Sequence, residues 1–175
     1  MPGSIFASFQ FSFLILQDEV LSKRIDLNHL TRESGNRIAV VMVAAQGMDD
    51  PVAELVRRME PADHRSVYVV APDLSENTKS DAQAPVAEMS AELRFHRLST
   101  DELSVAQGCL CCSFRSELNV FLGQLFMSLL ARREPVVKAV FVVTSSPDPA
   151  LLEQSLIHAP FLAQRYVYSG MLDLA

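Results

Sequence analysis

The chain has 175 residues, of which 49% are hydrophobic and 21% charged, and its net charge at pH 7 is −6. This length and balance are typical of a single folded domain with a full hydrophobic core rather than of a disordered chain. The negative charge argues against a protein that binds nucleic acid or an anionic membrane surface, because both select basic proteins. We therefore expect neither nucleic acid nor a membrane among its partners.

The first apolar stretch, residues 5–16, is shorter than the roughly 20 residues that a membrane-spanning helix needs. Residues 1–4 contain no Lys or Arg, so the basic start of a secretory signal is also absent and we expect a cytoplasmic protein. Phe9, Phe11 and Phe13 alternate with other residues, a spacing that indicates a strand. This stretch is either an extra edge strand or packing arm, or an arm through which two copies associate.

A short helix is expected over residues 18–30, and a polar stretch containing Gly35 follows at 31–36. We place the boundary of the main domain there. The chain then consists of an N-terminal extension, residues 1–36, and a single domain over residues 37–175.

The main domain alternates apolar runs of strand length with amphipathic segments. Asp50 and Pro51 form a helix start, and Ser113 is the expected N-cap of a long helix. Strands are expected at 38–45, 66–71, 93–98, 136–144 and 167–174. Helices are expected at 51–59 and 113–130, and a last helix that starts within 146–149 and ends at 157. This order predicts an α/β fold with a mainly parallel sheet flanked by helices.

Ligands of such sheets bind at the carboxyl ends of the strands. Three loops are expected at that edge, namely the loop containing Gly47, the segment 108–112 and the segment 145–148. We expect these loops to converge on one side of the sheet.

The chain's three cysteines, Cys109, Cys111 and Cys112, lie within four positions of one another. Thiolates are soft ligands that select Zn²⁺ and similar transition metals. In an extended segment the first two side chains point the same way, and a helix start at Ser113 favours the anionic, metal-binding form of the thiols. Metal binding is the interpretation we prefer. The alternatives are that the cysteines are buried as small hydrophobic residues or that they form a redox switch.

Three thiolates leave one position of a tetrahedral metal site open. Water, a ligand from a partner or another side chain of the protein would complete it. His96, Glu102 and His158 are the candidates in this chain, and the sequence does not distinguish among them.

The segment GCLCCSFRSEL resembles the signature GCxCC-[ST]-x-R-x-[DE]-L of the CobW-type GTPases, the P-loop metallochaperone relatives of UreG and HypB. The likeness extends over residues 37–175 and includes a strand followed by TSSPDP. It implies a P-loop-GTPase-like fold and a metal site at the cysteines. The residues that match the signature are Gly108, Cys109, Cys111, Cys112, Ser113, Arg115, Glu117 and Leu118.

The phosphate-binding motif of that family is degenerate in this chain. A P-loop requires Gly-Lys followed by Ser or Thr, and no Gly-Lys pair occurs here. In the register that starts at Gly47, Ala53 stands at the lysine position and Glu54 at the Ser/Thr position. Asp49 and Asp50 add negative charge where a triphosphate would lie. We therefore expect no GTP binding and assign no catalytic residue.

Three functions follow from these features. The first is a thiolate metal-binding protein that stores or delivers Zn²⁺ or a similar ion without hydrolysing GTP. The second is a pseudo-GTPase interaction module, which associates with itself or with an active family member through residues 5–16. The third is an active GTPase with an unusual phosphate site, which Ala53 and Glu54 oppose.

Overall fold

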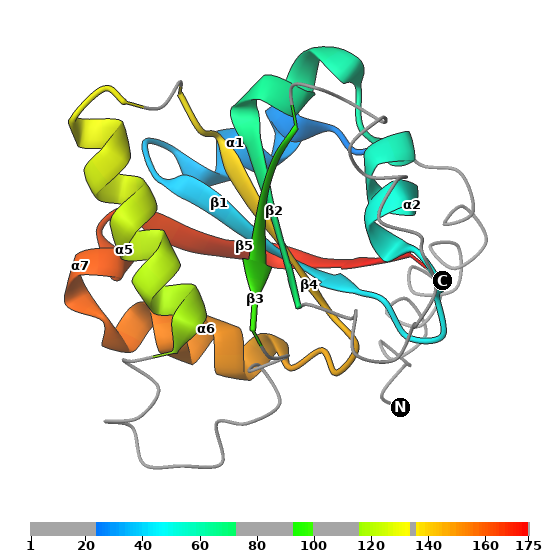
Figure 1. The fold of residues 1–175 in the computed structure, drawn as a ribbon. Helices are drawn as coiled ribbons and strands as arrows, with labels where there is room; N and C mark the ends of the chain where they lie inside the picture. Colours follow the sequence, from blue (N-terminus) through cyan, green and yellow to red (C-terminus); the bar gives the residue numbers. More distant parts are fainter. Residues whose placement is uncertain (1–23, 73–92, 100–115, 134–135, 175) are drawn as a thin grey trace, which may run out of the picture.

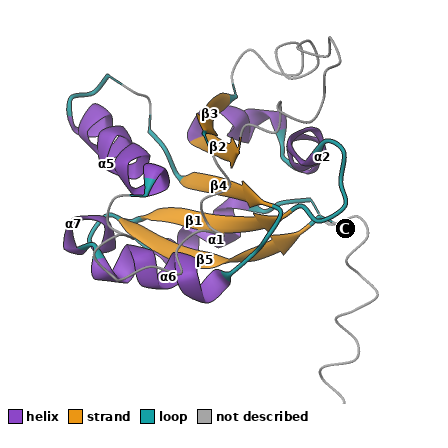
Figure 2. Cartoon of the chain, turned by 60° about the horizontal axis from the view of Figure 1, so that its bottom comes forward, coloured by secondary structure: helices purple, strands orange, loops and turns teal. Residues whose placement is uncertain are grey.

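The computed structural model describes residues 24–72, 93–99, 116–133 and 136–174, and the description below concerns these ranges (Figure 1). Five strands form one parallel sheet in the order β3-β2-β4-β1-β5 (Figure 2). The strands are β1 Ile38–Ala44, β2 Val67–Pro72, β3 Arg94–Leu98, β4 Ala139–Thr144 and β5 Tyr166–Asp173. The helices are α1 Leu27–Ser34, α2 Pro51–Arg58, the 3₁₀ helix η2 Pro61–Ser66, α5 Glu117–Leu130, α6 Pro149–His158 and α7 Pro160–Ala163. The expected parallel α/β fold is therefore confirmed.

Helices cover both faces of the sheet, which explains the unbroken apolar runs of the central strands. All residues of β1 and β4 are buried. Alternate residues of β1 face opposite sides, so Val41 lies in the core beneath α1 and α2, whereas Val40 lies in the core beneath α5, α6 and α7. Figure 1 shows α2 and α5 on opposite sides of the sheet.

Two helix starts differ from the sequence-based expectation. The first helix begins at Leu27 rather than at residue 18, because Asp26 caps it by accepting hydrogen bonds from the amides of Asn28 and His29. It then runs through most of the polar stretch to Ser34. Helix α5 begins at Glu117 with Ser116 as its N-cap, so the expectation of a cap at Ser113 was wrong.

Three further differences concern short elements. Strand β4 begins at Ala139, three residues later than expected, and the sequence reading missed both η2 and α7. Each of these two short helices starts at a proline, Pro61 and Pro160, whose fixed φ suits a first helical position. The predicted loop over residues 72–87 lies almost entirely outside the described residues.

The edge strand β5 contains a β-bulge. Tyr168 pairs with Val40 and Met171 with Met42, which leaves Ser169 and Gly170 opposite a single residue of β1. Gly170 has a φ of +112°, a value that L side chains rarely adopt. The bulge interrupts the regular outer edge of the sheet.

No helix within the described ranges has the length and apolar character that crossing a membrane requires.

Candidate functional site at the carboxyl edge of the sheet

Neighbouring strands β1 and β4 send the chain in opposite directions from their carboxyl ends. The chain leaves β1 through α2 and joins β2, on the far side of β4, whereas it leaves β4 through α6 and joins β5, on the far side of β1. The two helices also pack on opposite faces of the sheet. The carboxyl ends of β1 and β4 therefore form a topological switch point, the place where parallel α/β sheets bind ligands.

The loops after β1 and β4 meet at this switch point. Ala44 is the register partner of Thr144, and the amide of Ala45 donates to the carbonyl of Thr144 at 3.0 Å. The Gly47 loop and segment 145–148 therefore start side by side at the carboxyl edge, and whether they converge further on stays a prediction. The third expected loop, 108–112, lies outside the described residues.

The loop after β1 is a tight turn. The amide of Met48 donates to the carbonyl of Ala45, and Gly47 between them has a φ of +72°. Met48 packs against the core beneath α2. The turn requires a left-handed backbone at position 47, and this requirement accounts for the glycine without any bound phosphate.

The start of α2 is capped by the chain itself. The carboxylate of Asp50 accepts a hydrogen bond from the amide of Ala53 at 2.9 Å, and Pro51 occupies the first helical position and has no N–H. In a P-loop the corresponding backbone N–H groups point at phosphate. Here the amide of Ala53 is bonded to the carboxylate of Asp50 instead.

Glu54, which the sequence analysis aligned with the Ser/Thr position of a P-loop motif, interacts with residues of its own helix. Its carboxylate accepts a hydrogen bond from Nε of Arg58 at 2.8 Å and forms an ion pair with Arg57. The hydrogen bond from Arg58 lowers the pKa of Glu54, and the positive charge of both arginines lowers it further. Glu54 is thus an anion in a salt-bridge network.

Arg58 extends that network to the last strand. Its guanidinium donates to the carbonyl of Leu174 at 2.9 Å, just beyond the end of β5. Sequence patterns could not indicate this link, because Arg58 and Leu174 are 116 positions apart. Arg58 is largely buried, with 14% of its side chain exposed, and it joins α2 to the carboxyl end of β5.

The loop after β4, like the loop after β1, leads into a helix that is capped by an aspartate. The Thr144 hydroxyl accepts a hydrogen bond from the amide of Ser146, and the carboxylate of Asp148 caps α6 through the amide of Leu151 at 3.0 Å. Both helices that begin at the switch point therefore carry their own aspartate at the N-terminus.

The predicted metal ligands Cys109, Cys111 and Cys112 lie outside the described residues, as do Ser113 and Arg115 of the resemblance. The structure does describe the residues that flank them. The backbone amide and the hydroxyl of Ser99 both donate to one carboxylate oxygen of Glu117 at 2.7 Å. This pair, which we call the Ser99–Glu117 clasp, joins the end of β3 to the start of α5.

The clasp fixes both ends of the cysteine-bearing segment at the carboxyl edge of the sheet. The hydrogen bond from the Ser99 hydroxyl is the main cause of a lowered pKa of Glu117, and the nearby charge of His96 contributes. Spacing alone could not reveal this contact, because Ser99 stands 18 positions before Glu117.

The candidates for a fourth metal ligand separate in space. His96 lies on β3, and its ring stacks on Phe121 of α5 with 4.1 Å between the centroids. His158 is the exposed last residue of α6, a helix that begins at the carboxyl edge and runs away from it. Glu102 lies outside the described residues. Of the two histidines, His96 is therefore the one beside the clasp.

Among the residues that the structure describes, no three His, Cys, Asp or Glu side chains are grouped so as to hold a metal ion. Comparisons of the chain with protein-family models, with curated proteins and with solved structures found no significant match.

Proposed function

We propose that this protein binds Zn²⁺ or a similar transition metal through Cys109, Cys111 and Cys112, and that it stores or delivers this ion. The observation that carries the proposal is a concentration of all three thiols in a segment whose two ends are joined by the Ser99–Glu117 clasp. Joining the ends reduces the conformational entropy that the segment loses when its thiolates converge on one ion. The resemblance of this segment to the CobW-type signature supports the same function.

The proposal places the protein in the cytoplasm. Metal binding requires reduced thiols, and cytoplasmic glutathione and thioredoxin keep them reduced. His96 is the favoured fourth ligand, because it neighbours Glu117 and lies on the strand that leads into the segment.

An anaerobic titration of the reduced protein with Co²⁺ tests this function. Thiolate coordination should give a near-ultraviolet charge-transfer band and visible d–d bands that saturate near one equivalent and disappear when Zn²⁺ is added. The variant Cys109→Ser/Cys111→Ser/Cys112→Ser should show neither band. If the wild-type protein gives no saturable signal, the metal-binding function is wrong.

Two histidine variants test the fourth position. His96→Ala should weaken Co²⁺ binding and change the d–d bands, whereas His158→Ala, the matched control at the exposed end of α6, should titrate like the wild type. Identical titrations for both variants would show that water or another group completes the site.

We also propose that the protein does not use GTP. Asp50 places a carboxylate at the N-terminus of α2, and Glu54 carries a second negative charge on the first turn of that helix. Both charges oppose a triphosphate. A titration with a fluorescent GTP analogue and Mg²⁺ should therefore show no saturable binding, and reproducible GTP turnover by highly purified protein would contradict this part of the proposal.

A pseudo-GTPase interaction module is the second candidate function. An apolar groove between α5 and α7 favours it. In this function the fold provides a surface for a second copy or for an active family member, and it requires no metal.

A further inference from the structure

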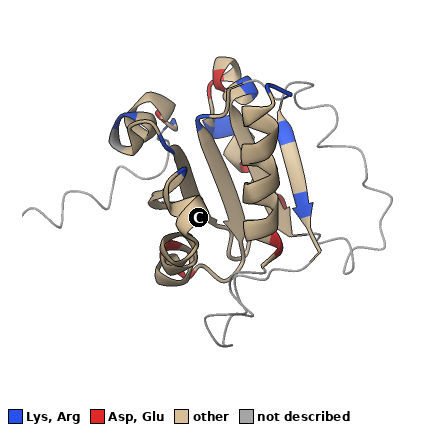
Figure 3. Cartoon of the chain, turned by 90° about the vertical axis from the view of Figure 1, so that its left-hand side faces the viewer, with Lys and Arg blue, Asp and Glu red and all other residues tan. Residues whose placement is uncertain are grey.

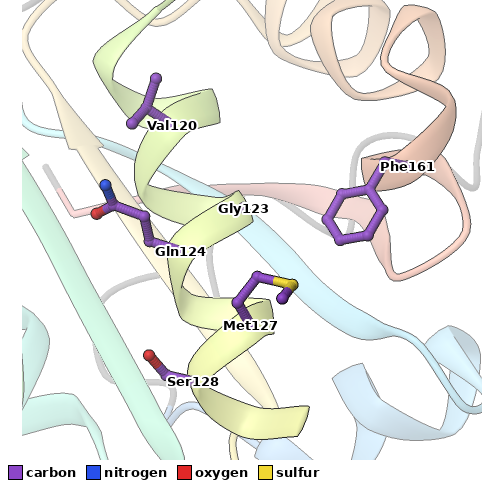
Figure 4. Close-up of a pocket in the computed structure, with 6 residues that line it drawn as sticks. All are labelled: Val120, Gly123, Gln124, Met127, Ser128 and Phe161. Carbon is purple, nitrogen blue, oxygen red and sulfur yellow. The ribbon is translucent and has the colours of Figure 1, made fainter. Parts of the chain in front are cut away.

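Helices α5 and α7 border an open apolar groove of about 710 Å³. Figure 4 shows the side chains of Val120 and Met127 on one side of it and the ring of Phe161 on the other. The residues that line the groove are Val120, Gly123, Gln124, Met127, Ser128 and Phe161.

Helix α5 carries apolar side chains on two faces. One face is buried against the sheet through residues such as Phe121, Leu122 and Leu125. The other exposes 50% of Val120 and 59% of Met127, and no charged residue occurs in α5 after Glu117 (Figure 3). This second face also contains Gln124 and Ser128, but it carries no charge, and its half-exposed apolar side chains are suited to burial against a partner.

The groove wall on α7 is held in place. Phe161 is 47% exposed, and its ring packs edge-to-face on Phe126 of α5 with 5.0 Å between the centroids. The guanidinium of Arg165 lies over the same Phe126 ring, 4.8 Å from its centroid. These contacts fix the distance between the two walls, so the groove is formed before a partner binds.

The chain itself contains a segment of matching chemistry. Residues 5–16 consist mainly of phenylalanine, leucine and isoleucine, and 23 residues precede the first described residue, Arg24. This apolar segment, which we call the N-terminal arm, contains no charged residue, in keeping with the uncharged groove. Burying such phenylalanine and leucine side chains in the groove would favour association.

The first described residues, to which the arm is connected, lie on the face opposite to the groove. The amide of Ile25 donates to the carbonyl of Arg58 at the end of α2, and Ile25 belongs to the core beneath α1 and α2. The groove lies on the other face, where α5 and α7 cover the second core. This geometry favours the arm of another copy over the arm of the same chain as the occupant.

The two sheet edges suit the arm less well. The bulge at Gly170 interrupts the outer edge of β5, and arginines at positions 94 and 97 of β3 place charge beside the other edge. The groove has neither a charge in its lining nor a backbone irregularity in α5.

We propose that the α5–α7 groove binds the N-terminal arm of a second copy of this chain. Two copies that exchange arms form a closed two-fold dimer, in which each groove is filled once. The proposal does not depend on the cysteines, so the dimer should form in the Cys109→Ser/Cys111→Ser/Cys112→Ser variant. Failure of the metal-binding function and failure of the dimer are thereby distinguishable.

The test is the molar mass of the full-length protein in solution, measured by light scattering and sedimentation. The wild type should have twice the 19.4 kDa mass of one chain. Met127→Glu, which places a charge in the groove, and Phe9→Asp/Phe11→Asp, which places charges in the arm, should each give the mass of one chain. Circular dichroism should show that both variants remain folded. Met127→Glu should be tolerated because Met127 is exposed.

Met171→Glu is the matched control. Met171 is 50% exposed, similar to Met127, but it lies on β5 and outside the groove lining. This variant should keep the mass of the dimer. A monomeric wild type, a dimer that survives Met127→Glu, or a dimer that survives the arm substitutions would each overturn the proposal.

A double-mutant cycle tests whether arm and groove meet. Phe161→Ala and Phe9→Ala/Phe11→Ala should each raise the dimer dissociation constant, and their combination should raise it by less than the product of the two effects. If the two effects multiply, the arm does not occupy the groove and the proposal is wrong.

Discussion

The phenol of Tyr166, the first residue of β5, donates a hydrogen bond of 2.6 Å to the main-chain carbonyl of Leu122 in the middle of α5. Tyr166 is 1% exposed and Leu122 is fully buried. Burial raises the pKa of Tyr166 far above its ordinary value, so the phenol is protonated and donates its hydrogen at neutral pH. This bond holds α5, and with it the apolar groove, on the sheet.

Tyr166→Phe should lower the free energy of unfolding by about 1–2 kcal/mol, because it removes the bond and leaves a buried carbonyl with one partner fewer. Urea denaturation followed by circular dichroism measures this change, and the slope of the transition should stay the same.

Tyr168→Phe serves as the control for the loss of a tyrosine hydroxyl. Tyr168 lies two residues further along β5 and is only half-buried. Its replacement should change the free energy of unfolding by less than about 0.5 kcal/mol, as is usual for an accessible site. Equal losses in the two variants would show that the bond to Leu122 contributes nothing.

Asp50→Ala should lower the free energy of unfolding by about 1 kcal/mol, because the amide of Ala53 loses its capping partner at the start of α2. Asp50→Asn keeps a side-chain oxygen at the same place and should retain most of the stability. Thermal unfolding of the three proteins at one pH gives this comparison, and an unchanged melting temperature in Asp50→Ala would exclude a capping role.

The central strands and the capped helix α2 could be predicted from the sequence for clear physical reasons. A strand covered on both faces must be apolar throughout, as in β1 and β4, and the pair Asp50-Pro51 has few uses other than a helix start. The starts of α1 and α5 were mispredicted because several polar residues compete for each cap, and only the surrounding packing selects Asp26 and Ser116.

The contacts of the candidate site depend on residues that are distant in the sequence. Arg58 reaches Leu174, and Ser99 reaches Glu117, and neither pair has a periodic signal. Composition identified the cysteines, but it gave no indication that the ends of their segment are joined. The groove was also missed, because its walls come from α5 and α7, two helices that are separated in the sequence.

Ser99→Ala and Glu117→Gln should each destabilise the protein modestly, and the double variant should lose less than the sum of the two losses. The reason is that both substitutions act on the same contact, the clasp between β3 and α5. Urea denaturation of the four proteins provides the cycle, and additive losses would show that the two side chains act independently.

The Glu54 network should stabilise the protein only while its carboxylate is charged. Its pKa in the folded protein is lowered from 4.5, so the contribution is complete above that value and is lost as the pH falls through the lowered pKa. Glu54→Gln should therefore reduce stability at pH 7 and should match the wild type more closely at pH 3. Melting temperatures across this range measure the effect, and a constant difference at every pH would contradict it.

Gly47→Ala should lower the free energy of unfolding by about 1 kcal/mol, because an alanine at a φ of +72° is strained by roughly 1–2 kcal/mol and regains part of this from a less flexible unfolded chain. Gly123→Ala, in the middle of α5, should instead raise the free energy of unfolding by about 0.5–1 kcal/mol through helix propensity, when it is compared in the Phe9→Asp/Phe11→Asp background so that the groove it lines is not occupied. A Cβ atom would meet no other atom within 4 Å at either position. The opposite signs therefore isolate the backbone conformation of the loop after β1, and a loss of stability in both variants would show that this conformation is not the cause.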